Sequence, residues 1–237
     1  MKKFFLSITI LFSGLMGLAQ KAVINDPNAE PRSINGSFNS IKISGGIDLY
    51  LSQYESESVA VSATSEKFRE NIKTVVENNT LKIYYDGGNN WTGNKKLKAY
   101  VSFKTLEMLE ATGACDVDVT GVISGPSLNL TMTGASDFKG AVKVNDLSIQ
   151  LTGASDVRIS GTATNLSVQS TGASDVKGYD LITERCTAKA SGASDINITV
   201  NKELNAHASG ASDISYKGTA VLKDKQSSGA SSVTKRG

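Results

Sequence analysis

The sequence predicts an all-β protein: a parallel β-helix, or solenoid, with about 19 residues per coil, preceded by a β-rich region that contains one short helix. Three observations predict this fold class. The phrase Gly-Ala-Ser-Asp recurs every 18–21 residues through the second half of the chain. Apolar and polar residues alternate before each copy, as they do in half-buried strands. The residue directly before each repeat glycine is always Thr or Ser.

The repeat glycines mark the corners of the predicted coils, where the backbone needs a positive φ or a close approach between coils. They are Gly113, Gly134, Gly153, Gly172, Gly192, Gly210 and Gly229. The first copy reads Gly-Ala-Cys-Asp and the last reads Gly-Ala-Ser-Ser. We expect the alanine to face a narrow interior, and the serine and aspartate to hydrogen-bond local backbone amides. Each unit would then be a strand of about six residues, a corner and a second short strand.

The strand before most corners carries apolar residues six, four and two positions before the glycine. In one unit these are Leu128, Leu130 and Met132. A single strand cannot bury this side alone, so the units must stack. A hairpin repeat with the phrase at its tips is the alternative. The near-constant corner favours the β-helix, because hairpin tips drift in sequence.

The N-terminus is typical of a signal peptide over residues 1–19. Lys2 and Lys3 precede an apolar run that ends in the small residues around Ala19, where we expect cleavage. An uncleaved anchor helix is the alternative, but the run is short for a span of about 20 residues. The mature chain has no second long apolar run, so we expect no transmembrane segment in it.

The rest of the chain is expected to form one continuous domain over 37–237, after a leader at 20–36. Its N-terminal β-rich part covers 37–104, with alternating strands from Ile41 to Leu51 and at 59–61. It also has one helix from Ser65 to Ile72, a hairpin around Asn78 to Thr80, a loop holding Trp91, and a strand at 97–103. The repeats cover 105–237.

Charge and cysteine content exclude some classes. The chain has 25 Lys+Arg and 23 Asp+Glu, and cleavage removes two lysines, so the near-neutral mature chain argues against nucleic-acid binding. Cys186 stands in a leucine position and Cys115 in a serine position. Their coils would lie ~15–20 Å apart, whereas a disulfide needs Cα atoms within about 7 Å. We therefore expect two free thiols.

The repeated aspartates would form a ladder along the stack: Asp116, Asp137, Asp156, Asp175, Asp195 and Asp213. Like charges about 5 Å apart repel by just under 1 kcal/mol in water. The carboxylates could accept backbone N–H bonds in each turn, splay into water, or gather a cation such as calcium. Hydrogen bonding to the backbone in each turn is favoured, so we expect no metal site and no bound cofactor. No melting-temperature shift at millimolar calcium would exclude the cation ladder.

The sequence shows no constellation that would carry catalysis. His207, the only histidine, is at an outward position with Lys189 and Gln226 as expected stack neighbours. We find no Ser/His/Asp arrangement, metal-ligand spacing or phosphate loop, and we expect no enzyme. The polar positions one and three before each glycine form a flat stripe, which is a solvated face or a surface for carbohydrate or protein. It lacks the aromatic residues that stack on sugars.

The repeated phrase, together with Gly46-Ile47-Asp48 in the first strand pair, resembles the head-GIN-domain family of putative autotransporter adhesins, which is frequent in Bacteroidetes-type bacteria. The resemblance covers about residue 37 to the end, with Asp48 where the family signature has Asn. It implies an exported right-handed β-helical domain in the periplasm, at the outer membrane or on the cell surface.

The sequence leaves three functions open. The first is a non-enzymatic binding or adhesion domain whose partner is a protein or glycan of the cell envelope. The second is a structural envelope module without a discrete ligand, with self-association left open. The third is a carbohydrate-active β-helix enzyme, for which acidic residues would have to converge in a cleft.

Overall fold

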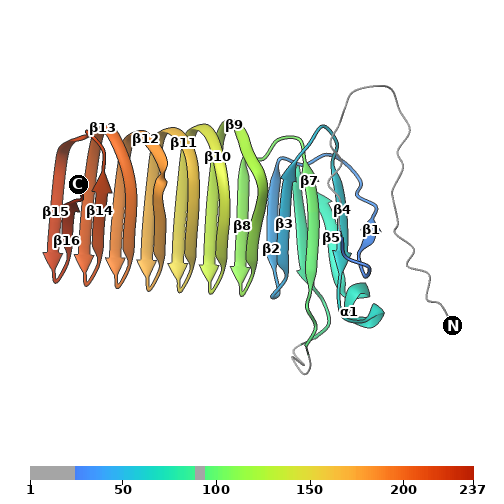
Figure 1. Ribbon diagram of the computed structural model, residues 1–237. Coiled ribbons are helices and arrows are strands. Elements are labelled where there is room, and N and C mark those ends of the chain that lie inside the picture. The colour runs from blue at the N-terminus through green and yellow to red at the C-terminus, as the bar shows by residue number, and fades with distance from the viewer. Residues whose placement is uncertain (1–24, 89–93) are drawn as a thin grey trace.

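The computed structural model describes residues 25–88 and 94–237, so the expected signal peptide and Trp91 lie outside the described residues. The N-terminal elements are β1 (Glu30–Arg32), β2 (Ser40–Ser44), β3 (Asp48–Gln53), β4 (Ser58–Ser62), α1 (Glu66–Glu70), β5 (Ile72–Glu77), β6 (Thr80–Tyr85) and β7 (Lys98–Phe103). The repeat elements are β8 (Met108–Gly113), β9 (Asp116–Gly134), β10 (Asp137–Gly153), β11 (Asp156–Gly172), β12 (Asp175–Gly192), β13 (Asp195–Gly210), β14 (Asp213–Lys217), β15 (Val221–Gly229) and β16 (Ser232–Lys235). These strands wrap into one elongated solenoid (Figure 1).

Each central repeat is one coil that pairs with its neighbours over almost its whole length. Strands β9 to β13 have 16–19 residues, running from the aspartate of one corner to the glycine of the next. They pair in parallel with the corner glycines in register. This confirms a parallel β-solenoid of about 19 residues per coil. The expected six-residue strands were wrong, because the ladder continues around the second bend of each coil.

The solenoid has two faces, which we name by their relation to the corners. The entry face holds the segments that lead into each corner, with β5, β6, β2, β8 and β15. The exit face holds the segments that follow each corner, with β1, β4, β7, β3, β14 and β16. Leu128, Leu130 and Met132 on the entry face are at most 1% exposed, as their spacing predicted. They share the core with Val117 and Phe138 of the exit face.

The corner serines point into the core, which reverses the roles expected for Ala and Ser. Ser136, Ser155 and Ser174 are fully buried, whereas the alanines before them are exposed. Ser174 Oγ accepts the N–H of Ser155 at 3.2 Å and donates to the carbonyl of Gly153 at 3.1 Å. The hydroxyls therefore link successive coils and satisfy backbone groups that would otherwise be buried without partners.

We expect Ser174→Ala to cost about 1–3 kcal/mol, because it leaves the buried Ser155 N–H without an acceptor. Thermal unfolding should show a fall of about 2–4 °C for each kcal/mol lost. Ser174→Cys is the matched control, since Cys115 occupies the equivalent position and is fully buried there. An alanine variant as stable as wild type, or a cysteine variant that loses more, would refute the role of the hydroxyl.

The first corner of the solenoid lies in the N-terminal part of the chain. Ser44 pairs with Thr112 and Leu49 with Val117, so Gly45-Gly46-Ile47-Asp48 stands beside Gly113 to Asp116. Ile47 is fully buried where later coils place Ser or Cys. Strands β2 and β3 thus form a coil between β6 and β7 on one side and β8 and β9 on the other.

Short antiparallel elements close the N-terminal end. Strands β5 and β6 form the predicted hairpin, with φ of 49° and 58° at Asn78 and Asn79. The predicted helix is present as α1, and Ser65 Oγ accepts the N–H of Phe68 at 3.4 Å as its N-cap. Strands β1 and β4 pair antiparallel beside β7.

The last coil closes the C-terminal end with polar groups. In β15, Lys225 and Ser227 stand in register with the buried Ala206 and Ala208. Lys225 Nζ donates to the carbonyl of Val233 at 3.1 Å, and Ser227 Oγ donates to that of Ser231 at 2.7 Å. These bonds join the entry and exit faces, so polar side chains cover the open core.

Candidate functional site

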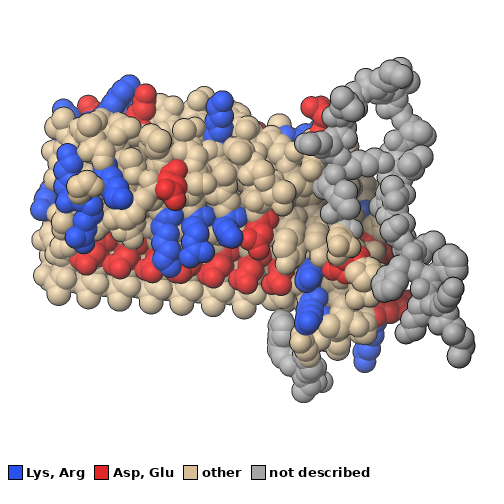
Figure 2. Space-filling model, in the orientation of Figure 1, with Lys and Arg blue, Asp and Glu red and all other residues tan. Residues whose placement is uncertain are grey.

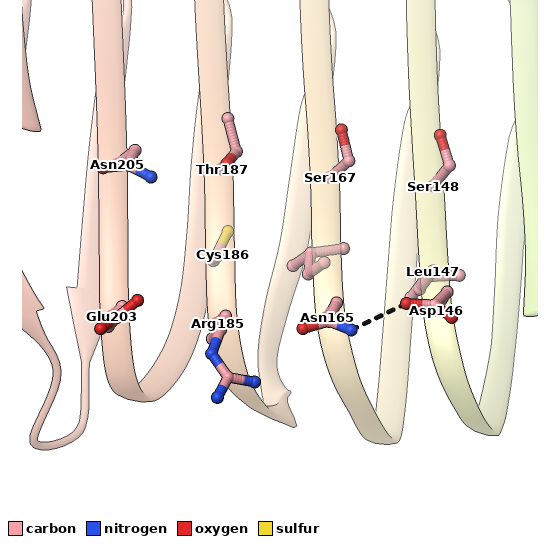
Figure 3. Close-up of a pocket in the computed structure, with 11 residues that line it drawn as sticks. Asp146, Leu147, Ser148, Asn165, Ser167, Arg185, Cys186, Thr187, Glu203 and Asn205 are labelled. Atoms are coloured by element: carbon pink, nitrogen blue, oxygen red, sulfur yellow. Dashed lines mark hydrogen bonds between the residues drawn. The ribbon is translucent and has the colours of Figure 1, made fainter.

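A surface groove crosses four coils of the entry face, from β10 to β13. Its volume is about 390 Å³. Figure 3 shows its two rows of polar side chains. One row holds Ser148, Ser167, Thr187 and Asn205, and the other lies nearer the bend and holds Asp146, Asn165, Arg185 and Glu203.

The parallel register places these side chains in rows. Asp146, Asn165 and Arg185 are cross-strand neighbours, and Arg185 is in turn paired with Glu203. The second row, two residues further along each strand, carries mainly short hydroxyl side chains. The groove follows this short row beside the longer side chains of the first. Between them Leu147, Leu166 and Cys186 point into the core and are at most 3% exposed.

Several polar groups of the groove keep free hydrogen-bonding capacity. Asn165 Nδ2 donates to Asp146 Oδ1 at 2.8 Å. Arg185 Nη1 lies 3.9 Å from Glu184 Oε2, which is too far for a hydrogen bond. Glu184 instead pairs with Lys202 at 2.8 Å, and this bond lowers the pKa of Glu184. The Arg185 guanidinium is half exposed and free to donate to a ligand.

The cysteines are unsuited to nucleophilic chemistry. Cys115 and Cys186 are both free, as predicted, and both are buried. Burial raises the pKa of both thiols, although hydrogen bonds from the backbone of Ile47 and Gly46 oppose the shift at Cys115. Both therefore remain protonated at neutral pH and act as small apolar side chains.

The predicted aspartates form a ladder on the exit face, and Asp48 extends it by one coil. Figure 2 shows a row of acidic side chains along the solenoid. Asp137 Oδ1 accepts the N–H of Asp156 at 3.2 Å, and Asp213 Oδ1 accepts that of Ser232 at 3.1 Å. Both bonds run to the next coil, so the expected capping within each turn was wrong.

Basic side chains beside the ladder offset part of its charge. Lys139, Arg158 and Lys177 form the neighbouring outward row. Lys177 Nζ lies 2.8 Å from Asp156 and 3.6 Å from Asp175. The hydrogen bond to Asp156 raises the pKa of Lys177. Within residues 25–88 and 94–237, no group of three or more His, Cys, Asp or Glu could hold a metal ion.

Beside Asp116 the neighbouring outward row holds Asp118 in place of a basic side chain, and the carboxyl pKa values at this end of the ladder are raised. For Asp116 the first cause is burial, followed by the charges of Asp137 and Asp118. Burial is also the first cause of the raised pKa of Asp48, followed by the charge of Asp116, whereas the charge of Lys98 lowers this pKa. A raised folded-state pKa means that ionisation destabilises the fold above that pKa. The penalty disappears as the pH falls below the unfolded value near 3.8.

Asp116→Asn is therefore expected to raise the melting temperature at pH 7 by about 2 °C, since it removes a partly buried charge and its repulsion by Asp137, which is just under 1 kcal/mol in water. The gain should shrink as the pH falls towards 4, because protonation of the wild-type carboxyl then removes its charge. Melting curves between pH 4 and 8 test this. Asp180→Asn, which changes an exposed aspartate outside the ladder, is the control. A gain that does not vary with pH would contradict the charge argument.

Other polar groups are engaged within the protein. His207 stands between Lys189 and Gln226, as predicted, and its Nε2 lies 2.8 Å from Asp224 Oδ2. A second hollow of about 470 Å³ lies between α1, β1 and β5. Its Glu30 pairs with Arg69 at 2.7 Å and with Arg32 at 3.0 Å. These charged groups are satisfied internally, which leaves the groove as the better candidate.

Sequence reasoning missed the groove residues Asp146, Asn165, Arg185 and Glu203. They occupy the position seven before each repeat glycine, just outside the apolar series. The sequence did contain a signal, because four consecutive units place a charged or amide side chain there. Two residues later three of them place Ser or Thr, and the fourth places Asn205.

In the described part of the chain, no helix is long and apolar enough to cross a membrane.

Comparison with known proteins gives a family and a fold. The model of the family described as "Putative auto-transporter adhesin, head GIN domain" matches residues 37–220. A crystal structure described as a putative adhesin from Bacteroides fragilis has a TM-score of 0.82 at 20% identity, covering 88% of this chain and 96% of that one. Among curated proteins no match is found.

Two structures from Parabacteroides distasonis have the same architecture. One, described as a putative adhesin, has a TM-score of 0.72 at 16% identity, covering 88% of this chain and 96% of the other. The second, described as a putative lipid binding protein, has a TM-score of 0.67 at 20% identity, covering 89% and 97%. At these identities the similarity establishes the fold alone.

Proposed function

Because the chain belongs to the family described as "Putative auto-transporter adhesin, head GIN domain", we propose that it is an exported, non-enzymatic binding domain of the cell-adhesion type. The groove across β10 to β13 carries this proposal. It is an open polar surface on a rigid sheet, and such sites hold their side chains more precisely than loops do. Its partner would be a component of the cell envelope.

The distribution of acidic groups favours binding over catalysis. Glycoside hydrolysis commonly needs two carboxyl groups that face each other across the substrate. In the ladder the carboxylates stand side by side along one edge of the exit face. In the groove, Asp146 and Glu203 lie on β10 and β13, with β11 and β12 between them. They border a surface and do not converge on one bond.

Retention of envelope components by the purified domain tests this function. The domain without residues 1–19 is immobilised and exposed to separated glycan and protein fractions of the envelope. We expect a defined fraction to be retained by wild type and lost with Arg185→Ala/Asn205→Ala. The matched control Arg158→Ala/Lys177→Ala alters the exit face and should behave as wild type. Equal retention by all three proteins, or no retention at all, would refute the proposal.

Export is tested separately on intact cells. A membrane-impermeant amine reagent should label surface lysines such as Lys143 and Lys189 if the domain is displayed outside the cell. Labelling only after the outer membrane is opened would place it in the periplasm. A domain that fractionates with the cytoplasm would contradict export altogether.

A further inference from the structure

The groove presents one pair of polar side chains on each coil, so these pairs recur at the spacing of the coils. Neighbouring strands are about 4.8 Å apart, so the three steps from β10 to β13 span about 14 Å. A pyranose ring is close in length to one such step. A linear sugar chain lying along the solenoid axis would therefore meet a new pair of polar side chains with each ring.

The side chains of the groove fit hydroxyl groups. A hydroxyl both donates and accepts, and the groove offers both kinds of partner. Arg185 donates only, the carboxylates of Asp146 and Glu203 accept only, and the amides of Asn165 and Asn205 do both. Ser148, Ser167 and Thr187 add short hydroxyls between them. This mixture suits a ligand that is rich in hydroxyls and has no dominant charge.

The charge of the groove disfavours an acidic polymer. Two carboxylates and one guanidinium line it, and Lys223 Nζ lies 3.9 Å from Glu203 Oε1, so the groove has no excess of positive charge that would attract an acidic polymer. A chain of uronic acids would place a carboxylate near Asp146 or Glu203 for each one near Arg185. Repulsion of this kind weakens the binding of a wrong partner, even where it adds no affinity for the right one.

An extended peptide is a poorer fit for two reasons. The backbone groups along this stretch are already used in the ladders between β10, β11, β12 and β13, so no strand can be added on this face. Protein partners are also usually anchored by apolar or aromatic side chains in a pocket. The apolar residues beneath the groove, Leu147, Leu166 and Cys186, are at most 3% exposed.

We infer that the groove binds a neutral, linear glycan that lies along the solenoid axis across β10 to β13. Arg185 and Asn165 make its central contacts, with one sugar ring near each coil. This inference rests on the proposed binding function and names the ligand class for the same site.

Calorimetric titration with short linear oligosaccharides tests the inference. The neutral probes are tetramers of β-linked glucose, mannose, xylose and N-acetylglucosamine, and the acidic probe is tetragalacturonate. We expect at least one neutral tetramer to bind, and to bind more tightly than its dimer, because only the tetramer spans all four coils. Arg185→Ala and Asn165→Ala should each weaken binding about tenfold, the loss expected for a hydrogen bond to a charged group or for two neutral ones.

Matched controls lie on the same strands outside the groove. Lys189→Ala removes a cation from β12, and Gln169→Ala removes an amide from β11. Both should bind as wild type does, and melting curves should show that all four variants are folded. Neutral binding that persists in the groove variants, or that falls equally in the controls, would overturn the location.

The remaining outcomes separate the ligand class from the function. Preferential binding of tetragalacturonate would overturn the neutral class. Failure of every tetramer, while an envelope protein fraction is still retained through Arg185 and Asn205, would overturn the glycan and leave the binding function standing. Failure of both assays would overturn both proposals.

Discussion

Replacing the corner residue Gly192 by alanine is expected to destabilise the solenoid by at least about 3 kcal/mol. Gly192 has a φ of +87°, and an added Cβ would lie 2.6 Å from the carbonyl oxygen of Gly172 on the preceding coil. That oxygen accepts the N–H of Ala193 at 2.7 Å, so it is held in place. Neither backbone can move without opening the stack.

Gly121→Ala separates the clash from the backbone strain. Gly121 has a nearly identical φ of +84°, but no atom lies within 4 Å of the added Cβ. It should cost only the left-handed strain of about 1–2 kcal/mol. Urea unfolding of both variants, with free energies extrapolated to water, measures the difference. Equal losses would show that close coil contact does not account for the glycine.

A compensating pair in the core of β10 gives the second large effect. The ring of Phe138 and the side chain of Val119 on β9 both fill the space above Gly140, and a Cβ at Gly140 would lie 2.9 Å from Phe138 Cζ and 2.8 Å from Val119 Cγ2. The next coil places Val157 and Ile159 at the registered positions, which fills the same volume with the residue sizes exchanged. We expect Phe138→Val to cost about 2–4 kcal/mol through the cavity, and Gly140→Ile to cost about 1–3 kcal/mol through overpacking.

The double variant should recover part of both losses, because it copies the Val-Ile pattern of β11 but keeps the close contact with Val119. Its coupling energy, measured by a double-mutant cycle in urea, should favour the pair by about 3 kcal/mol or less, the upper range seen for residues in contact. Gly178→Ile in β12 is the control, since Val176 stands at the position of Phe138 and the atom nearest to the added Cβ is the carbonyl oxygen of Asn197, at 3.1 Å. Additive losses at 138 and 140 would contradict the packing account.

The repeat could be predicted from the sequence because its information is local and periodic. In the five central units, from Gly134 to Gly210, the positions two, four and six before the glycine, such as Leu130 and Met132, are buried because the alternation of a strand puts them on one side. The hairpin of β5 and β6 and the cap at Ser65 carry their own signals in neighbouring residues. Each of these features depends on a few residues that are adjacent in the chain.

The features that were missed depend on contacts across coils. A corner serine looks like a surface residue until the neighbouring coil supplies the backbone groups that Ser174 bonds. Gly45 to Asp48 shares only Gly and Asp with the repeated phrase and lies 68 residues before Gly113, so its membership of the series depends on strand pairing. The groove likewise exists only because four units place Asn165, Arg185 and their neighbours side by side.

The placement of β2 and β3 between later strands has a kinetic consequence. Residues 40–53 leave the ribosome before the strands with which they pair, because these partners lie at 80–85, 98–103 and 108–120. They must wait, unpaired, until a loop of several dozen residues closes on each side, which slows the first folding step. The repeats that follow each need only the coil about 19 residues earlier.

The same arrangement makes unfolding directional. At the C-terminal end, coils can detach one at a time, as the ends of other solenoids do. At the N-terminal end, the outermost strands β1 and β5 also pair on one side only, whereas β2 and β3 lie between strands on both sides and can leave only by parting two interfaces. We therefore expect the C-terminal coils to open before the coil formed by β2 and β3.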